Sequence, residues 1–267
     1  MLIDYHLHTA RCGHASGTMQ QYIDAARQVG LTEVGIADHI PMYWLPSEKR
    51  DPEVAMTDKE LTGYIVEVQQ LQQANLDITI KLGLEVDYIP GHEKAAEEII
   101  SSLPLDYVLG SVHYLDGWGF DNPEYMHKFD QWNLYELYQH YFDTVCQGAK
   151  SGLFNIMAHT DLIKKFGHRP NWDLSPLYEQ VASTFAESAV SVELNTAGLR
   201  YPALEQYPSK ELLKVLYKHK VPVTMGSDAH NPQQVGQDIK IARQMLIEVG
   251  YKEIATFSNR QIKYCSL

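Results

Sequence analysis

The stretch MLIDYHLHT, residues 1–9, decides how the rest of this chain is interpreted. Its apolar, β-prone opening is followed directly by His6 and His8. Because side chains in a strand repeat every two residues, the two imidazoles are expected on the same side of an extended chain. A single histidine near a strand end is usually an ordinary surface or core residue. The pair gains its meaning from the rest of the sequence, where the same arrangement recurs.

Short apolar runs that end in His, Asp or Glu are repeated along the chain. Together with the first run they predict seven strands, the later six over residues 33–37, 78–84, 107–112, 154–158, 190–194 and 221–226. Amphipathic segments with capping residues predict a helix after each strand, beginning near Thr18, Thr57, Gly91, Asn133, Ser175, Ser209 and Asn231. Two long loops rich in aromatic residues, 40–56 and 114–132, follow the second and fourth strands.

This alternation predicts parallel strands joined by right-handed crossovers. An open doubly wound sheet and a closed barrel both satisfy it, but only a barrel brings every strand's C-terminal end to one mouth. Six of the seven predicted strands end in a potential metal ligand. We therefore predict an α/β fold of the TIM-like type, a distorted seven-stranded (β/α)7 barrel that residues 1–267 form as a single domain. The metal site is expected at the C-terminal ends of its strands.

Composition restricts the cellular setting. The longest apolar runs fall short of the roughly 18 residues needed to span a bilayer, and Asp4 interrupts the apolar start, unlike a signal peptide. A cytoplasmic protein without membrane contact is expected. The three cysteines have no CxxC spacing, which argues against a disulfide framework or a thiolate zinc site: Cys12, Cys146 and Cys265.

The formal net charge of −12 argues against binding to nucleic acid, which needs a footprint of lysine and arginine. A small anionic substrate would need local positive charge, and the twelve histidines could supply it by holding metal ions. A homo-oligomer is compatible with this composition.

Candidate metal ligands lie at or just after the predicted strand ends. They are His6, His8, His14, His39, Glu85, His113, His159, Asp228 and His230. A single zinc ion takes about four ligands, and catalytic sites leave one position open, so nine ligands imply two or three ions. Imidazole and carboxylate without thiolate suit Zn, Fe or Mn.

The motifs that carry these ligands resemble the polymerase and histidinol phosphatase (PHP) superfamily, and within it the monofunctional histidinol-phosphate phosphatases. The resemblance covers nearly the whole chain. It rests on HLHT at 6–9, GH at 13–14, ADH at 37–39, GLEVDY at 83–88, GSVHYLDGWGFDNP at 110–123, AHTDLIKKFG at 158–167, ELNTAGLR at 193–200 and GSDAH at 226–230.

The resemblance implies three divalent transition-metal ions at the barrel mouth and hydrolysis of L-histidinol phosphate. By this pattern the ions would be held by His6, His8, Glu85 and Asp228; by Glu85, His113 and His159; and by His14, His39 and His230. A bridging Glu85 would place between two ions a water whose pKa is lowered toward about 7, giving a hydroxide nucleophile. Glu85, Asp228 and His230 are the expected catalytic residues.

Substrate contacts are expected from the loops. A guanidinium matches phosphate with two donors, so Arg200 is predicted to bind the phosphate, with Lys164 or Lys165 as a second cation. The imidazole and ammonium of histidinol could be received by Trp118, Asp116 and Asp121. Alternatively, the segment GWGFDNP simply packs the loop on itself.

Other functions remain open at this point. The same site could act on a phosphotyrosine, a nucleotide or a sugar phosphate. A proofreading or structural module serving a polymerase is disfavoured by the net charge of −12 and the missing basic channel. A zinc-stabilised binding protein would have closed coordination without a position for water.

Overall fold

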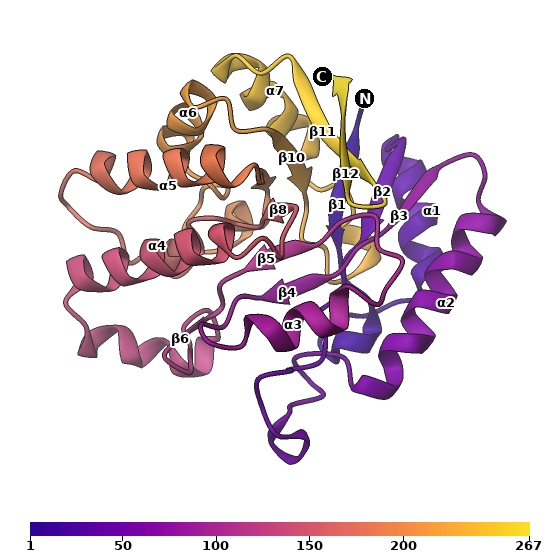
Figure 1. Ribbon diagram of the computed structural model, residues 1–267. Helices are drawn as coiled ribbons and strands as arrows, with labels where there is room; N and C mark the ends of the chain where they lie inside the picture. Colours follow the sequence, from indigo (N-terminus) through magenta and orange to yellow (C-terminus); the bar gives the residue numbers. More distant parts are fainter.

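The computed structural model describes residues 1–267 and contains two parallel sheets (Figure 1). The first has the order β1-β2-β3, with bounds Ile3–Leu7, Glu33–Ile36 and Thr79–Leu82. The second has the order β10-β9-β8-β5-β4, with bounds Val223–Gly226, Ser191–Asn195, Ile156–Met157, Leu109–Ser111 and Glu85–Asp87. The predicted α/β class with parallel strands is confirmed.

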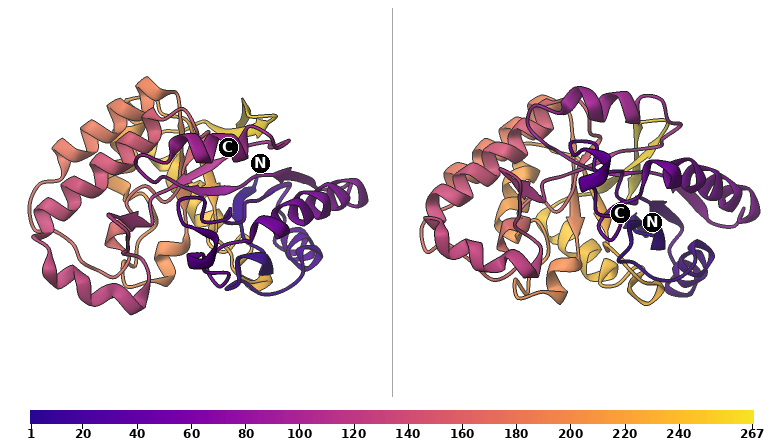
Figure 2. Two further views of the ribbon diagram at one scale, coloured as in Figure 1. Left: turned by 60° about the horizontal axis from the view of Figure 1, so that its bottom comes forward. Right: turned by 90° about the horizontal axis from the view of Figure 1, so that it is seen from below.

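Seven α-helices follow the strands and lie on the outside of the sheets (Figures 1 and 2). Their bounds are α1 Met19–Val29, α2 Asp58–Ala74, α3 Glu93–Ile100, α4 Leu134–Lys150, α5 Ser175–Ser188, α6 Lys210–Lys218 and α7 Ile239–Val249. Short 3-10 helices cover Ala10–Cys12, Ser47–Lys49, Pro123–Gln131, Leu162–Lys164, Ala197–Arg200 and Pro232–Gln234. The predicted caps are present at α1, where Thr18 and Gln21 form a capping box, and at α4, where Asn133 accepts from two backbone N–H groups.

The third predicted strand, 78–84, is divided between the two sheets. It ends at Leu82, and the chain bends at Gly83 before β4 begins at Glu85. A Cβ on Gly83 would lie 2.3 Å from the ring of Tyr107, so this bend needs glycine.

Two isolated bridges connect the sheets. Leu7 of the edge strand β1 pairs with Ala229, which follows the edge strand β10, and His39, which follows the central strand β2, pairs with Glu85 of β4. The pairing is therefore interrupted at these two seams, and the sheets do not share one continuous hydrogen-bonded ladder. His39 and Glu85 are themselves predicted ligands, and Leu7 and Ala229 are next to predicted ligands in the sequence. Both seams therefore lie at the predicted site.

One cluster of 73 buried apolar residues runs through the molecule from Ile3 to Phe257. At the amino ends of the strands the ring of Tyr5 stacks on that of Tyr107, with centroids 4.8 Å apart, and both lie beside Phe257. Burial of this apolar surface is the main stabilising contribution to the fold.

The C-terminal segment differs from the prediction. The last helix begins at Ile239 and not near Asn231, and an antiparallel hairpin that was not predicted follows it, β11 (Glu253–Ser258) and β12 (Gln261–Ser266). The hairpin covers the amino ends of the strands: Arg260 Nη2 donates to Leu153 O at 2.6 Å. Both termini lie together at this end in Figure 1.

The two long loops extend from the opposite end, where the predicted ligands gather. Loop 40–56 contains one short 3-10 helix and projects from the molecule in Figure 1. Loop 114–132 contains a small hairpin, β6 (Tyr114–Leu115) with β7 (Trp118–Gly119), followed by the 3-10 helix Pro123–Gln131. None of the helices combines the length and the hydrophobicity that crossing a membrane requires.

Candidate metal centre

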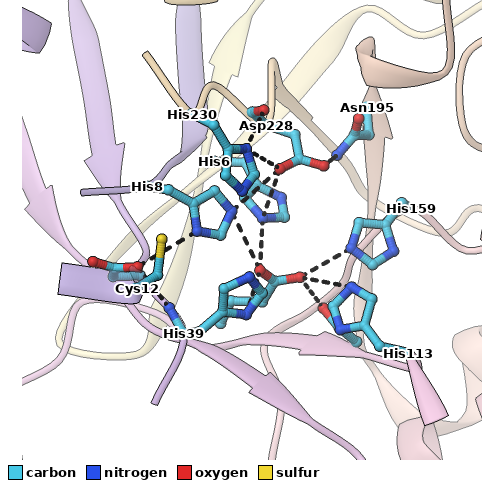
Figure 3. A network of polar contacts seen from close by, with 12 residues as sticks. His6, His8, Cys12, His39, His113, His159, Asn195, Asp228 and His230 are labelled. Atoms are coloured by element: carbon cyan, nitrogen blue, oxygen red, sulfur yellow. Dashed lines mark hydrogen bonds and ion pairs between the residues drawn. The ribbon is translucent and has the colours of Figure 1, made fainter. Parts of the chain in front are cut away.

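Glu85, the first residue of β4, is the centre of the site. Its side chain is almost completely buried, and imidazole nitrogens surround both of its oxygens. The histidines that supply them are labelled in Figure 3. Oε2 lies 3.1 Å from His6 Nε2, 3.4 Å from His8 Nε2 and 3.2 Å from His39 Nδ1. Oε1 lies 2.9 Å from His159 Nε2 and 3.6 Å from His113 Nε2. Five histidines from the ends of four strands, β1, β2, β5 and β8, therefore converge on one carboxylate, as expected at a common mouth.

Asp228 approaches the same cluster from the end of β10. Its Oδ1 lies 3.2 Å from His8 Nε2 and 3.8 Å from His6 Nε2 (Figure 3). The four residues grouped for one ion by the resemblance, His6, His8, Glu85 and Asp228, are thus in mutual contact.

The remaining candidate ligands lie toward the cavity. His14 Nε2 is 3.0 Å from His230 Nε2, and the ring centroids of His14 and His39 are 5.6 Å apart. Cys12 lies beside them, with Sγ 3.9 Å from His14 Nε2. All three cysteines are free thiols. The structure brings all nine predicted ligands into one connected cluster.

The donor set fits a group of metal ions. The buried Nε2 of His6 and both ring nitrogens of His8 have no hydrogen-bond partner. A buried polar atom without a partner is costly, typically about 1 to 3 kcal/mol, and buried groups of this kind usually have one. Because these nitrogens face carboxylate oxygens and belong to an N and O donor set, a divalent cation bound between them would satisfy both.

Charge inside the cluster shifts the pKa values strongly. Burial alone would raise the pKa of Glu85, but the imidazoles of His39 and His6 outweigh burial and hold it well below its usual range. Burial alone would lower the pKa of His6, but the carboxylates of Glu193, Glu85 and Asp228 raise it well above its usual range. Glu85 is therefore anionic, and a metal ion would compete with protons for the imidazoles.

Two candidate ligands have unusual backbone conformations. The φ angle is 24° at His159 and 54° at Asp228. Left-handed backbone at a residue other than glycine costs roughly 1 to 3 kcal/mol and is concentrated at functional sites. At His159 the surrounding structure holds this conformation, because the backbone N–H donates to Glu193 Oε2 at 3.0 Å.

A cavity of about 800 Å³ opens over the cluster. Seven of the nine candidate ligands line it, whereas His6 and His8 lie fully buried behind them. The cavity is also lined by aromatic, acidic and basic side chains, among them Trp44, Tyr114, Tyr201, Tyr207, Asp51, Glu53, Lys128 and Lys165.

Of the residues predicted to contact substrate, Lys165 and Asp121 line this cavity. Lys165 Nζ donates to Asp121 O at 2.9 Å and lies 3.1 Å from its Oδ2. Lys164 does not line it, because its buried Nζ donates to Asp161, Glu205 and the carbonyl of Gln206, each at 2.8 or 2.9 Å. Lys165 is therefore the lysine of this pair that a ligand can reach.

Three other predicted contacts lie outside the cavity lining. Arg200 Nη2 donates to the backbone oxygens of Ser227 at 2.6 Å and Asp228 at 3.4 Å, so it supports the loop that carries a candidate ligand. Trp118 is buried against Phe129, with centroids 4.9 Å apart. Asp116 is exposed and pairs with His140. For Trp118 the structure favours the alternative in which the loop packs on itself, whereas Asp116 pairs with helix α4 outside the cavity.

Several carboxylates behind the histidines were not singled out from the sequence. Asp87 Oδ1 lies 2.9 Å from His113 Nδ1, Glu193 Oε1 lies 2.7 Å from His6 Nδ1, and Asp38 Oδ1 lies 3.6 Å from His8 Nδ1. Carboxylates that contact the second nitrogen of a metal-bound histidine orient the ring and raise its basicity. Asp38 and Asp87 adjoin predicted ligands in the sequence, and Glu193 is an acidic residue inside a predicted buried strand.

Comparisons with known proteins agree with this geometry. The model of the PHP domain family matches residues 4–197. A Deinococcus radiodurans protein described as a "probable histidinol-phosphatase" is 40% identical over 267 residues, covering 98% of each chain. The histidinol-phosphatase of Lactococcus lactis is 26% identical over 270 residues, covering 97% of this chain and 96% of its own.

A crystal structure of the Lactococcus lactis histidinol phosphate phosphatase, complexed with zinc, L-histidinol and phosphate, superimposes with a TM-score of 0.84. It is 23% identical and covers 98% of each chain. The two proteins share the same fold over their whole length.

Proposed function

Because this chain belongs to the PHP domain family, we propose that it is a metal-dependent phosphomonoesterase of histidine biosynthesis. It hydrolyses L-histidinol phosphate to L-histidinol and phosphate. The observation that carries this proposal is the convergence of five histidines on the buried carboxylate of Glu85 at the base of an open cavity. The full-length similarity to named histidinol-phosphatases supports the choice of substrate.

Three divalent ions, Zn, Fe or Mn, are the cofactors in this proposal. The residues that would hold them are His6, His8, His14, His39, Glu85, His113, His159, Asp228 and His230. Bound divalent ions of this kind lower the pKa of water toward about 7 and neutralise phosphoryl oxygens. The catalytic assignment of Glu85, Asp228 and His230 rests on their positions, since all three line the cavity.

We infer further that the two sheets act as one distorted seven-stranded barrel and that residues 1–267 form one domain. The bridges between Leu7 and Ala229 and between His39 and Glu85 support the barrel, because the first joins the edge strand β1 to the chain after β10 and the second continues the pairing of β2 from β3 onto β4. The continuous cluster of 73 buried residues supports the single domain.

The cavity suits a substrate with an anionic and a cationic end. Lys165 is the proposed phosphate contact of the chain itself, because it lines the cavity and the adjacent Lys164 does not. The cavity is also lined by the acidic side chains of Asp51 and Glu53 and by the aromatic pair Trp44 and Tyr114, with centroids 5.2 Å apart. An ammonium and an imidazole are favoured there over a second anion.

The experiment is phosphate release by the purified protein with its metal content measured. We expect L-histidinol phosphate to give a kcat/KM at least about 100-fold above those of phosphotyrosine, a nucleoside monophosphate and a sugar phosphate. Chelation should abolish activity, and added Zn, Mn or Fe should restore it. A higher kcat/KM for another ester would assign the site to that ester. Turnover that survives complete removal of metal would overturn the metal-dependent mechanism.

The two adjacent lysines provide a matched test of the phosphate contact. Lys165→Met should raise KM for L-histidinol phosphate by roughly 10-fold or more, because a charge-assisted contact contributes about 1.5 to 3 kcal/mol. Lys164→Met should lower the melting temperature and leave KM near the wild-type value, because Lys164 Nζ contacts only protein groups. The reverse pattern would exchange the two roles.

A further inference from the structure

Strand β9 is the one predicted strand without a candidate ligand at its end. It lies in the middle of the second sheet, between β8 and β10, which lead into His159 and Asp228. Beyond Ser191 at its start, it nevertheless carries the polar side chains of Glu193 and Asn195, and both are completely buried. A buried carboxylate is costly unless its oxygens are paired, so its partners indicate what it does.

Each oxygen of Glu193 contacts a different ligand-bearing segment. Oε1 lies 2.7 Å from Nδ1 of His6, which belongs to β1. Oε2 accepts the backbone N–H of His159 at 3.0 Å and the side-chain amide of Asn195 at 3.0 Å. No other protein side chain is arranged to bind the second ring nitrogen of His6 in this way. Glu193 therefore joins the ends of β1 and β8 through one anion.

Asn195 continues this network to a third strand end. Its Nδ2 also lies 3.4 Å from Oδ2 of Asp228 (Figure 3). Its Oδ1 accepts the backbone N–H of Ala197, which fixes the orientation of the amide. The pair thus contacts His6, His159 and Asp228 without lining the cavity.

Space for this arrangement comes from a glycine on the neighbouring strand. A Cβ on Gly226 would lie 2.0 Å from Glu193 Oε1 and 2.7 Å from His6 Cβ. Only glycine at this position lets the carboxylate reach the imidazole. Gly226 is paired with Asn195 in the sheet. The space left by its missing side chain therefore lies at the same level of the strands as the contacts of Glu193 and Asn195.

We infer that Glu193 is a positioning residue of the metal centre. Its carboxylate accepts the Nδ1–H of His6, so the lone pair of His6 is on Nε2, the nitrogen that faces Glu85 and Asp228. The same carboxylate holds the backbone of His159. The inference rests on the proposed metal-dependent function, but it concerns metal affinity and can be tested without substrate.

The main variant is Glu193→Gln, which preserves the shape of the side chain and removes its charge. The affinity for Zn²⁺, measured by competition with a chromophoric chelator, should fall roughly 10- to 100-fold, the usual effect of removing a carboxylate behind a metal-bound histidine. The absorption spectrum of the Co²⁺-loaded protein should change, because the ring of His6 is no longer held. At limiting Zn²⁺, kcat/KM should fall, and excess Zn²⁺ should restore most of it.

The matched control is Glu33→Gln. Glu33 is also a buried strand carboxylate, but it bonds the hydroxyl of Tyr5 at the opposite end of the strands. This variant should lower the melting temperature and leave the Zn²⁺ affinity within twofold of wild type. Because Glu193→Gln could fail to fold, Asn195→Ala provides a milder variant, for which we expect a Zn²⁺ affinity several-fold lower than wild type.

The outcomes distinguish a failure of the proposed function from a failure of the positioning role of Glu193. A wild-type protein that binds no Zn²⁺, Mn²⁺ or Fe²⁺ would overturn the proposed function together with this inference. A wild type that binds Zn²⁺ and hydrolyses L-histidinol phosphate, with Glu193→Gln at wild-type affinity, would overturn the inference alone. The metal-free variants could instead have lower melting temperatures while the Zn²⁺ affinity and the Co²⁺ spectrum stay unchanged. That result would show that Glu193 only stabilises the core.

Discussion

The two ends of the strands use similar side chains in opposite ways. At the amino ends, which we call the floor, the hydroxyl of Tyr5 bonds Glu33 and accepts the backbone N–H of Phe257 at 3.2 Å. At the carboxyl ends, which we call the mouth, the next residue, His6, keeps its Nε2 without a hydrogen-bond partner. One residue along β1 therefore separates a satisfied polar group from an unsatisfied one. The floor contributes stability, and the mouth retains the capacity to bind a cation.

Backbone conformation shows the same difference. The positive φ angles of His159 and Asp228 lie at the mouth, where neighbouring groups hold them. At the floor, the positive φ angles of Asn259 and Arg260 lie in the two-residue turn of the C-terminal hairpin, where such a turn requires them. Strain at the mouth is thus tied to ligand placement, and the left-handed residues at the floor only reverse the chain.

The largest effect is expected at the centre of the mouth. Glu85→Gln should lower kcat by on the order of 10³-fold or more, equivalent to about 4 kcal/mol, because five histidines lose their shared anion. Metal content, measured by elemental analysis, should fall in the same sample. Retention of both metal and kcat within tenfold would show that the centre of the site is elsewhere.

At the floor, Phe257→Ala should give the largest loss of stability. The ring is buried beside the stacked pair of Tyr5 and Tyr107, and removing a buried Phe usually costs about 3 to 5 kcal/mol. Urea unfolding measures this loss. If floor and mouth are independent, kcat/KM and metal content of the folded fraction stay at wild-type values. A loss of metal at 25 °C would instead couple the hairpin to the site.

The sequence was informative at the mouth because ligands stand at strand ends. A strand of parallel sheet ends where its polar residues begin, so the pattern alone could place His6, His39, His113 and His159 together at one end of the strands, as candidate ligands. Which neighbouring side chains face the cavity was harder to predict from the sequence. That Lys165 faces the cavity while Lys164 does not depends on the turn at Leu162–Lys164, which no periodicity in the sequence indicates.

The floor was less predictable. The C-terminal hairpin has a recognisable alternation, EIATFS and QIKYCS around Asn259 and Arg260, but it lies outside the strand and helix repeat that organised the prediction. The division of the third strand at Gly83 depends on the ring of Tyr107, which is distant in sequence. Such tertiary contacts override local propensity.

Arg200 provides a test between two roles, the phosphate contact predicted from the sequence and the support of a loop indicated by the structure. Its contacts with the carbonyls of Ser227 and Asp228 indicate that Arg200→Ala should loosen the loop of the mouth and cost about 2 to 3 kcal/mol in kcat/KM, with metal content falling in parallel. Excess metal should recover part of the activity. Full metal occupancy with the same loss of kcat/KM, and a similar loss in Arg200→Lys, would support the phosphate fork predicted from the sequence.

The smallest effect is expected from Tyr5→Phe, which changes the floor one residue away from a candidate ligand. The ring and its stacking on Tyr107 remain, so no cavity forms, but Glu33 and the backbone N–H of Phe257 lose a buried partner. Leaving such groups unpaired costs about 1 to 2 kcal/mol in the free energy of unfolding. Each kcal/mol lowers the melting temperature by roughly 2 to 4 °C.

The loss in free energy of unfolding should be equal in the metal-free and Zn²⁺-loaded proteins, because Tyr5 contacts no ligand. Urea unfolding of both forms measures it, with kcat/KM as the second readout. A larger loss in the Zn²⁺-loaded form, or a fall in kcat/KM beyond twofold, would show that β1 transmits changes from the floor to His6.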